Sequence, residues 1–164
     1  MPIVLVRIDD RLIHGQVVEG WLKPLRANHI VVVSDAVARD RSQQILFSMA
    51  VPSAIKVSTF SIEETAAKIL EGYFEKDRVM LLLSAPQDAV RLINSKVKFS
   101  SINVGGMHYS SGKRQLLRTL SVNESDISAL KEIGGKGIEL EGRVLPNDER
   151  VDIMDVLNDN SSKQ

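Results

Sequence analysis

The stretch VLVRIDDRLIHGQVV, Val4–Val18, contains the pattern on which the rest of the chain builds. Its first half is an apolar run, typical of a buried strand, and predicts a strand over Ile3–Ile8. From Gly15 to Leu25 the apolar residues recur at the spacing of one helix face instead. The stretch therefore predicts a strand that leads through a polar loop into a helix, with His14 where the helix begins.

That position of His14 favours anion binding. The first turn of a helix has backbone N–H groups without intrahelical partners, and the aligned peptide dipoles place partial positive charge there. The amides of Gly15, Gln16 and Val17 can donate to a phosphate beside the imidazole, and Gly15 leaves room for its close approach. A histidine at this place can hold an anion or carry a phosphoryl group covalently.

The charged neighbours of His14 suit the same chemistry. Arg11 supplies a permanently charged, forked donor, and Asp9 or Asp10 can accept a proton from one imidazole nitrogen and so select the other as nucleophile. On spacing alone, however, an ordinary polar loop is the better-supported interpretation, because loops between strands and helices are routinely polar.

Length and composition restrict the class of protein. The 164 residues are the usual size of one domain, expected over 1–157 and followed by a disordered polar tail at 158–164. With 21 basic and 21 acidic side chains, there is no net charge to attract nucleic acid or an anionic membrane. The absence of cysteine excludes disulfides, thiolate zinc sites and cysteine nucleophiles.

The sequence also predicts where the protein acts. The first apolar run is too short for a signal peptide, and no run is long enough to cross a bilayer. We therefore expect a cytoplasmic protein that serves any membrane system only as a docked partner. A homodimer is an expectation from base rates alone.

Strands and helices alternate along nearly the whole chain. This order predicts an α/β fold, with a mostly parallel open sheet covered by helices on both faces. The remaining strands are predicted at His29–Ser34, Ala54–Phe60, Arg78–Leu83, Ser101–Val104, Leu116–Val122 and Gly137–Pro146. The remaining helices are predicted at Ala36–Val51, Ile62–Gly72, Gln87–Asn94, from Asn123 or Ser125 to Ile133, and at Asp148–Leu157.

Residues at helix starts give the sharpest local signals. Asp35 is the predicted N-cap of the helix Ala36–Val51. Ser61, with Glu64 three residues later, has the pattern of a capping box.

Three polar loops follow predicted strands, at Asp9–His14, Ser84–Gln87 and Gly105–Arg114. Ligands of such folds bind outside the carboxyl ends of the strands, so the three loops are expected to converge on one site. Ser84 and Gly106 are accordingly candidate contacts for the phosphate.

Other functional motifs fit the sequence less well. The loop GGMHYSSGKR has five residues between Gly106 and Gly112 where a Walker A loop has four, so it predicts at most a cover for an anion, and a flexible connection explains it equally. His14 and His108 lack further ligands at metal-binding spacing, and His29 is interpreted as a plain residue at a strand boundary. The paired acids Asp9 and Asp10 suggest a receiver domain, but the third predicted strand ends without the acceptor aspartate.

The motif RIDDRLIHGQV, Arg7–Val17, resembles the active-site signature of the Enzyme IIB subunits of the mannose/fructose/sorbose class of the bacterial phosphoenolpyruvate:sugar phosphotransferase system (PTS). The resemblance continues through the pair Gly20-Trp21, IVVVSD at Ile30–Asp35, FSMAVP at Phe47–Pro52 and VGGMHY at Val104–Tyr109, and covers essentially the whole chain.

The resemblance implies a phosphoryl carrier. His14 is expected to accept phosphate, on Nδ1, from the phosphohistidine of an Enzyme IIA partner and to pass it to a sugar as the membrane IIC/IID permease imports it. The chain would then be a cytoplasmic transferase that associates peripherally with the permease and needs no metal or cofactor. A module that docks or regulates without delivering phosphate to sugar is the alternative, and the sugar is not predictable, since the membrane subunits bind it.

The expected site residues fall into two groups. His14 is the expected carrier of the phosphoryl group, with Arg11 and Asp10 as further catalytic residues. The expected phosphate-binding residues are Gly15, Gln16, Arg11, Ser84 and Gly106.

Overall fold

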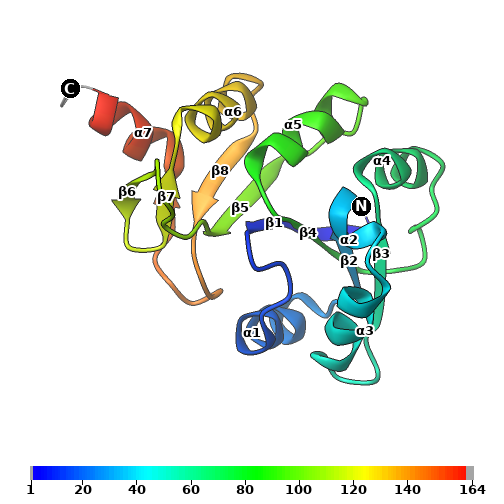
Figure 1. Ribbon diagram of the computed structural model, residues 1–164. Helices are drawn as coiled ribbons and strands as arrows, with labels where there is room; N and C mark the ends of the chain where they lie inside the picture. Colours follow the sequence, from blue (N-terminus) through cyan, green and yellow to red (C-terminus); the bar gives the residue numbers. More distant parts are fainter. Residues whose placement is uncertain (1, 162–164) are drawn as a thin grey trace.

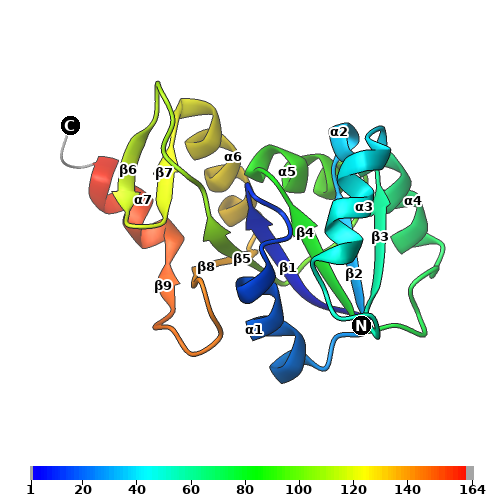
Figure 2. The same ribbon diagram turned by 60° about the horizontal axis from the view of Figure 1, so that its bottom comes forward.

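A seven-stranded sheet forms the centre of the protein (Figures 1 and 2). The computed structural model describes residues 2–161. The strands lie in the order β3-β2-β4-β1-β5-β8-β9, and all pair in parallel except β9, which is antiparallel to β8. Their bounds are Ile3–Asp9 (β1), His29–Val33 (β2), Lys56–Phe60 (β3), Val79–Leu83 (β4), Ser101–Gly106 (β5), Glu139–Gly142 (β8) and Val151–Asp152 (β9). The predicted α/β architecture is confirmed.

The helices cover both faces of this sheet. α1 and α3 lie on one face, and α4, α5, α6 and α7 on the other (Figure 1). Their bounds are Gly15–Leu25 (α1), Asp35–Ala38 (α2), Arg41–Met49 (α3), Ile62–Leu70 (α4), Pro86–Asn94 (α5), Glu124–Gly135 (α6) and Ile153–Ser161 (α7). Of these, α1 has the predicted bounds, and the Ser61–Glu64 capping box starts α4 as predicted.

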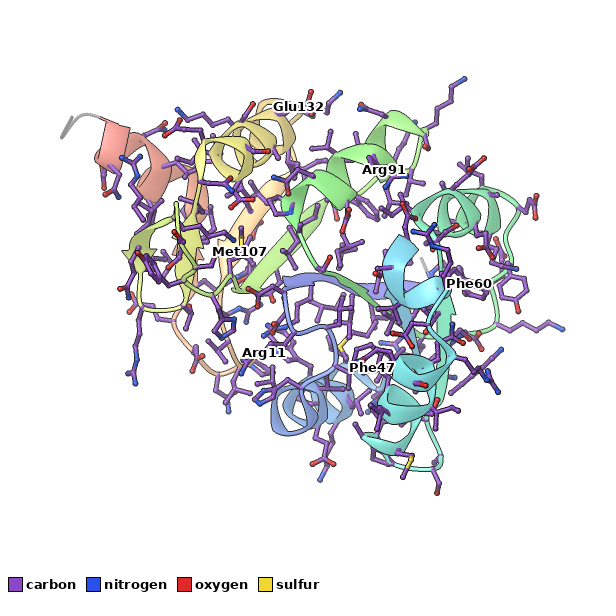
Figure 3. All side chains as sticks on the ribbon, in the orientation of Figure 1. Arg11, Phe47, Phe60, Arg91, Met107 and Glu132 are labelled. Carbon is purple, nitrogen blue, oxygen red and sulfur yellow. The ribbon has the colours of Figure 1, made fainter. Side chains whose placement is uncertain are left out.

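Successive side chains of the central strands point to opposite faces of the sheet, and they form a hydrophobic core on each face. In β4, Leu81 and Leu83 face the core under α4–α6, whereas Met80 and Leu82 face the core under α1 and α3. Figure 3 shows Phe47 of α3 in this second core. The five residues of β4 are fully buried, which fits their unbroken apolar run.

The order of the strands places the end of β1 at a topological switch point. The chain leaves β1 toward β2 by way of α1 on one face, and later crosses from β4 to β5 by way of α5 on the other face. Ile8 of β1 pairs with Leu83 of β4 and with Val104 of β5, so β1 lies between these strands. Ligands of open parallel sheets bind at such a point, outside the carboxyl ends of the strands.

The predicted helix Ala36–Val51 is wrong, because the segment forms the two helices α2 and α3. The N-cap of α2 is Ser34, not Asp35, since the Ser34 side chain accepts a hydrogen bond from the Val37 amide. The Asp40 side chain accepts from the Gln43 amide and starts α3 as a new helix.

The glycine-rich segment after Val104 also differs from the prediction. Gly105 and Gly106 extend β5 instead of opening a loop. The predicted strand Leu116–Val122 is wrong, since the chain turns within it and forms a separate antiparallel hairpin, which consists of β6, Arg114–Leu117, and β7, Leu120–Val122. A residue outside the hairpin holds this turn, because the Met107 amide donates a hydrogen bond to the Thr119 carbonyl.

The C-terminal boundaries shift as well. Strand β8 ends at Gly142, and α7 begins at Ile153 and continues to Ser161, beyond the predicted end at Leu157. The first part of the predicted polar tail is therefore helical, and residues 162–164 lie outside the described part. Within residues 2–161, no helix combines the length and the apolar character that a membrane crossing requires.

Candidate functional site

His14 is an exposed N-cap residue at the start of α1. Its backbone is extended (φ −126°, ψ 106°), and its carbonyl accepts a hydrogen bond from the Val18 amide. Among the described residues, no side chain caps the helix, and its first turn carries no acidic residue. The helix N-terminus beside His14 therefore keeps its donors and its partial positive charge available for an anion.

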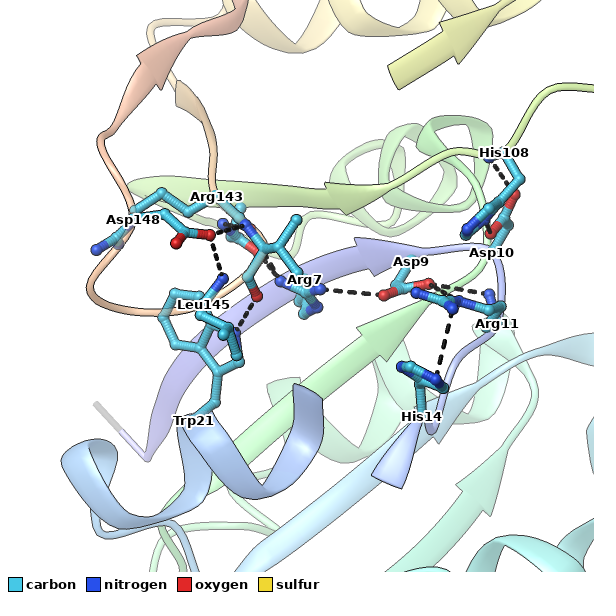
Figure 4. A network of polar contacts seen from close by, with 12 residues as sticks. Arg7, Asp9, Asp10, Arg11, His14, Trp21, His108, Arg143, Leu145 and Asp148 are labelled. Carbon is cyan, nitrogen blue, oxygen red and sulfur yellow. Dashed lines mark hydrogen bonds and ion pairs between the residues drawn. The ribbon is translucent and has the colours of Figure 1, made fainter. Parts of the chain in front are cut away.

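Arg11 is the side chain that contacts the His14 ring. Its Nη1 lies 3.5 Å from Nε2 of His14, as Figure 4 shows. A turn brings the two residues together: Leu12 has a left-handed backbone (φ 58°), and its amide donates to the Asp9 carbonyl. Leu12 and Ile13 are buried against α1 and anchor the loop, so Arg11 and His14 remain outside, on the surface.

The buried Asp9 side chain holds Arg11 in place. Its Oδ1 accepts a hydrogen bond from the Arg11 amide at 3.0 Å and lies 3.8 Å from the Arg11 Nε. Its Oδ2 accepts from Nη2 of Arg7 at 3.0 Å, and Asp9 and Arg7 are each 1% exposed. Asp9 thus links the buried end of β1 to the arginine at the surface.

Arg7 begins a polar network beneath the loop. Its Nη1 donates to Oδ1 of Asn103 and to the Arg143 carbonyl. Asn103 in turn donates to Glu141, which accepts two hydrogen bonds from the Arg143 guanidinium. Burial lowers the pKa of Arg7 against the opposing effect of Asp9, and the hydrogen bond to Glu141 raises the pKa of Arg143. A buried charge is stable only when paired, and here each charge has a partner.

Asp10 points the other way and pairs with His108. Its Oδ2 accepts from the His108 amide at 2.7 Å, and its Oδ1 lies 2.6 Å from the His108 Nδ1. Neither acid is bonded to His14 among the described contacts, so the two acids do not orient that ring as the sequence suggested. A catalytic role for Asp10 stays a prediction, and in this geometry Asp10 would act through His108.

A family model for the PTS system sorbose subfamily IIB component matches residues 3–164. The chain belongs to this IIB family. It is 40% identical to the PTS system fructose-specific EIIB component of Bacillus subtilis (strain 168), over 96% of both chains.

Solved structures agree with this assignment. The IIBSor domain of the sorbose permease from Klebsiella pneumoniae superposes with a TM-score of 0.92 at 35% identity, over 97% of this IIB chain and 98% of that chain. The PTS system mannose-specific EIIAB component of Escherichia coli (strain K12) is 40% identical over 96% of the IIB chain, which spans 49% of that relative.

Two glycines at the end of β5 make room for the charged side chains of the candidate site. A Cβ on Gly105 would overlap the guanidinium of Arg7, and one on Gly106 would lie 3.2 Å from Oδ1 of Asp9. The Gly106 carbonyl also accepts a hydrogen bond from the Asp10 amide. Gly106 thus packs against the site, and a direct contact with phosphate stays a prediction.

The other predicted phosphate contacts fall into two groups. Gly15 and Gln16 form the first turn of α1, next to His14. Ser84 follows β4, but its hydroxyl donates to Oδ2 of Asp88, and no contact with His14 is seen in the described structure. Burial raises the pKa of Asp88 against the effect of that hydrogen bond. Lys113 belongs to the loop GGMHYSSGKR, which was expected at most to cover an anion, and its Nζ lies 3.6 Å from Oδ2 of Asp126.

The interpretation of His29 as a plain boundary residue is wrong. The residue is fully buried at the start of β2, at the opposite end of the strands from His14. Its Nδ1 lies 2.8 Å from Oδ2 of Asp77, its Nε2 lies 2.8 Å from Oγ of Ser58, and its ring packs edge-on against Phe74. Burial lowers its pKa.

His108 is the site residue that sequence reasoning undervalued. The sequence analysis considers His108 only for a metal pair with His14, which the spacing of ligands does not support. Within residues 2–161, no group of three or more histidine or acidic side chains is placed to hold a metal ion. The usable signal was its position two residues after a strand that ends in glycine, at the edge of the sheet where Asp10 also follows a strand.

Proposed function

We propose that this IIB chain accepts a phosphoryl group from a phosphohistidine of Enzyme IIA on His14, and passes it to a sugar during uptake through a IIC/IID permease. The observation that carries the proposal is an exposed histidine at an uncapped helix N-terminus with an arginine 3.5 Å from its ring. Family membership supports it, because IIB components take part in the phosphotransferase system.

The proposed step exchanges one P–N bond for another. A neutral His14 nitrogen attacks phosphorus through its lone pair, and the P–N bond of the donor breaks. The electron pair stays on the donor, which leaves as a neutral imidazole because its other ring nitrogen carries a proton, and the second ring nitrogen of His14 keeps its own proton. Such transfer passes through a loose, largely dissociative transition state and depends on positioning and on charge stabilisation. In this proposal, Arg11 and the amides of α1 stabilise the charge on the equatorial oxygens, which is supported by the 3.5 Å contact of Arg11 with His14 and by the uncapped start of α1.

The identity of the attacking nitrogen constrains the ring. An arginine only donates, so a hydrogen bond from Arg11 to Nε2 of His14 needs an unprotonated Nε2, with the ring proton on Nδ1. If Nδ1 attacks, as the family resemblance implies, the proton must move to Nε2 and this contact must open. The guanidinium of Arg11 is then released toward the incoming phosphoryl oxygens.

The proposed phosphoryl donor is a protein, and the chain is proposed to work beside a membrane protein. The mannose-specific relative is an EIIAB component, which by its name combines A and B parts in one protein, and this chain covers 49% of its length. A IIA partner facing His14 is therefore the proposed donor. We further propose that the chain works in the cytoplasm, peripherally associated with the permease, while a dimer stays a prediction.

Mass spectrometry tests the carrier role. The chain is incubated with phosphoenolpyruvate, the general PTS components and IIA, and the phosphorylated residue is located by fragmentation under conditions that preserve P–N bonds. We expect one phosphate, on His14, and none in His14→Ala or when phosphoenolpyruvate is omitted. Phosphate retained by His14→Ala would disprove the assignment.

Delivery to sugar needs a separate measurement. Membranes that carry the cognate permease are supplied with the phosphorylated chain and a labelled sugar. Formation of sugar phosphate supports the transferase role. A chain that is phosphorylated at His14 but forms no sugar phosphate with its own permease would instead be a regulatory or docking module.

A further inference from the structure

The pair formed by Asp10 and His108 joins two segments that are far apart in the sequence. Asp10 is the first residue of the active loop, Asp10–His14, and both of its carboxylate oxygens are used by His108. One oxygen accepts the backbone N–H at 2.7 Å and the other lies 2.6 Å from the ring Nδ1. An ionised carboxylate can only accept hydrogen bonds, so Nδ1 of His108 carries the ring proton and donates a hydrogen bond to Asp10.

The segment that holds Asp10 is itself fixed. The Asp10 amide donates to the Gly106 carbonyl, which continues the pairing of β1 with β5 by one further hydrogen bond. The neighbouring Met107 donates its amide to the Thr119 carbonyl and accepts from the Ser121 amide, so it is bonded on both sides to the β6–β7 hairpin. His108 therefore extends from a rigid segment, and Asp10 is bonded to the sheet.

This support lies directly beside the reactive groups. Arg11, the next residue, contacts Nε2 of His14, and one peptide bond links Arg11 to the Asp10–His108 pair. Figure 4 shows Arg11 between His14 and the Asp10–His108 pair. Asp9 holds the buried side of the same loop, because its carboxylate accepts a hydrogen bond from the Arg11 amide. The backbone of Arg11 is thus held on one side by the buried Asp9 and on the other by the exposed pair.

We propose that His108 is a positioning residue for phosphoryl transfer, acting through Asp10 on the placement of Arg11 and His14. The inference rests on the proposed carrier role of His14 and adds a residue to that site. His108 touches no reacting atom. Its ring bond to Asp10 restricts the loop, so that less conformational freedom is lost when the phosphoryl group is transferred.

Two variants with a side-chain amide test whether the hydrogen-bond donor must stand at the place of Nδ1 of His108. In His108→Asn, the side-chain amide nitrogen takes the place of Nδ1 and can still donate to Asp10. In His108→Gln, the amide lies near the place of Nε2, away from Asp10. The backbone hydrogen bond from residue 108 is retained in both, and in His108→Ala. Ser110→Ala serves as the control for a change in the same exposed segment.

Rapid-quench transfer from phosphorylated IIA to the chain is the kinetic test. We expect the maximal transfer rate to fall about 10-fold in His108→Ala and His108→Gln, as misplacement of reacting groups predicts, with the IIA concentration at half-maximal rate unchanged. The His108→Asn and Ser110→Ala variants should transfer within about twofold of the unmodified chain. Wild-type rates in His108→Ala, or a His108→Asn as slow as His108→Ala, would overturn the proposal.

Amide hydrogen exchange without any phosphoryl donor makes the result independent of the carrier role. The amides of Arg11 and Leu12 should exchange faster in His108→Ala and His108→Gln than in His108→Asn. If the unmodified chain takes no phosphate on His14, the proposed function fails. The exchange rates still show whether the hydrogen bond from the His108 ring to Asp10 restrains the loop. Equal exchange in all four variants would show that the ring does not hold the loop.

Discussion

Asp9 and Asp10 are adjacent in the sequence but belong to two different regions of the site. Asp9 lies in the buried network beneath the active loop, with Arg7 as its partner, and is 1% exposed. Asp10 lies at the exposed rim and is held by His108. Asp9 is the last residue of β1 and lies on the same face as Arg7, whereas Asp10 begins the loop and its side chain is directed away from the network, to His108.

Both acids lie at hydrogen-bond distance from their partners, yet the burial of the two pairs differs. Burial therefore decides how much each pair contributes to stability. In the buried network, removal of one partner leaves the other charge without water or a counter-ion, which is the costly outcome. At the rim, water replaces the lost partner. We therefore expect the buried region to contribute mainly stability and the rim mainly the placement of the loop.

The largest effect is expected for Asp9→Ala. It leaves the Arg7 guanidinium buried without its carboxylate, and such a loss costs about 3–5 kcal/mol of unfolding free energy. Asp10→Ala, one residue along, removes hydrogen bonds that water can replace and should cost no more than about 1.5 kcal/mol. Urea unfolding of the two variants measures the difference, and equal losses would contradict the distinction between the regions.

Gly105→Ala tests whether the buried region has any spare room. A Cβ would overlap the guanidinium of Arg7, which is held by Asp9, Asn103 and the Arg143 carbonyl. We expect a loss of about 2–4 kcal/mol, because either the backbone shifts or these bonds break.

Gly135→Ala is the matched control, since a Cβ at this last residue of α6 would meet no atom within 4 Å apart from its chain neighbours and the nearby backbone of its own helix. Helix propensity predicts a gain there of up to about 1 kcal/mol. The two alanines are compared by thermal unfolding. A Gly105→Ala variant as stable as Gly135→Ala would mean that Arg7 can leave its place at little cost.

Arg11 joins the two regions, and its removal should affect rate rather than stability. Arg11→Ala should slow transfer to His14 by about 10- to 1000-fold, as expected for a donor that stabilises the transition state. Because its guanidinium is exposed, the unfolding free energy should change by about 0.5 kcal/mol or less. Rapid-quench transfer gives the rate, and Arg118→Ala, which removes an exposed arginine in the β6–β7 turn, is the control. A rate within about twofold of the unmodified chain would exclude this role.

Local patterns predicted the parts of the structure that depend on neighbours in the sequence. The strand β1, the helix α1 and the Ser61–Glu64 capping box all follow from residues within one turn or one strand. The pairing of Arg7 with Asp9 also carries a local signal, because a charge inside a buried strand requires a partner, and the residue two positions on shares its face.

The partners that were missed are far apart in the chain. Arg7 meets Asn103, and Asp10 meets His108, only because the crossover through α5 places β5 beside β1. A polar residue after a strand indicates the edge of the sheet, but not which side chain of the neighbouring strand faces it. The same limit explains His29, whose partner Asp77 precedes β4.

His29 provides the smallest expected effect and extends the comparison to the other end of the sheet. Burial lowers its pKa in the folded chain, so below the ordinary histidine pKa of about 6.5 the unfolded chain binds a proton that the folded chain does not. Stability is therefore complete above that pH and falls on acidification, by at most about 1.4 kcal/mol per pH unit. Urea unfolding at pH 7.5 and pH 5.5 measures this fall. In His29→Asn the difference between the two pH values should shrink, whereas in Ser58→Ala, which keeps the buried imidazole, it should persist; the same difference in both variants would assign the pH dependence to another group.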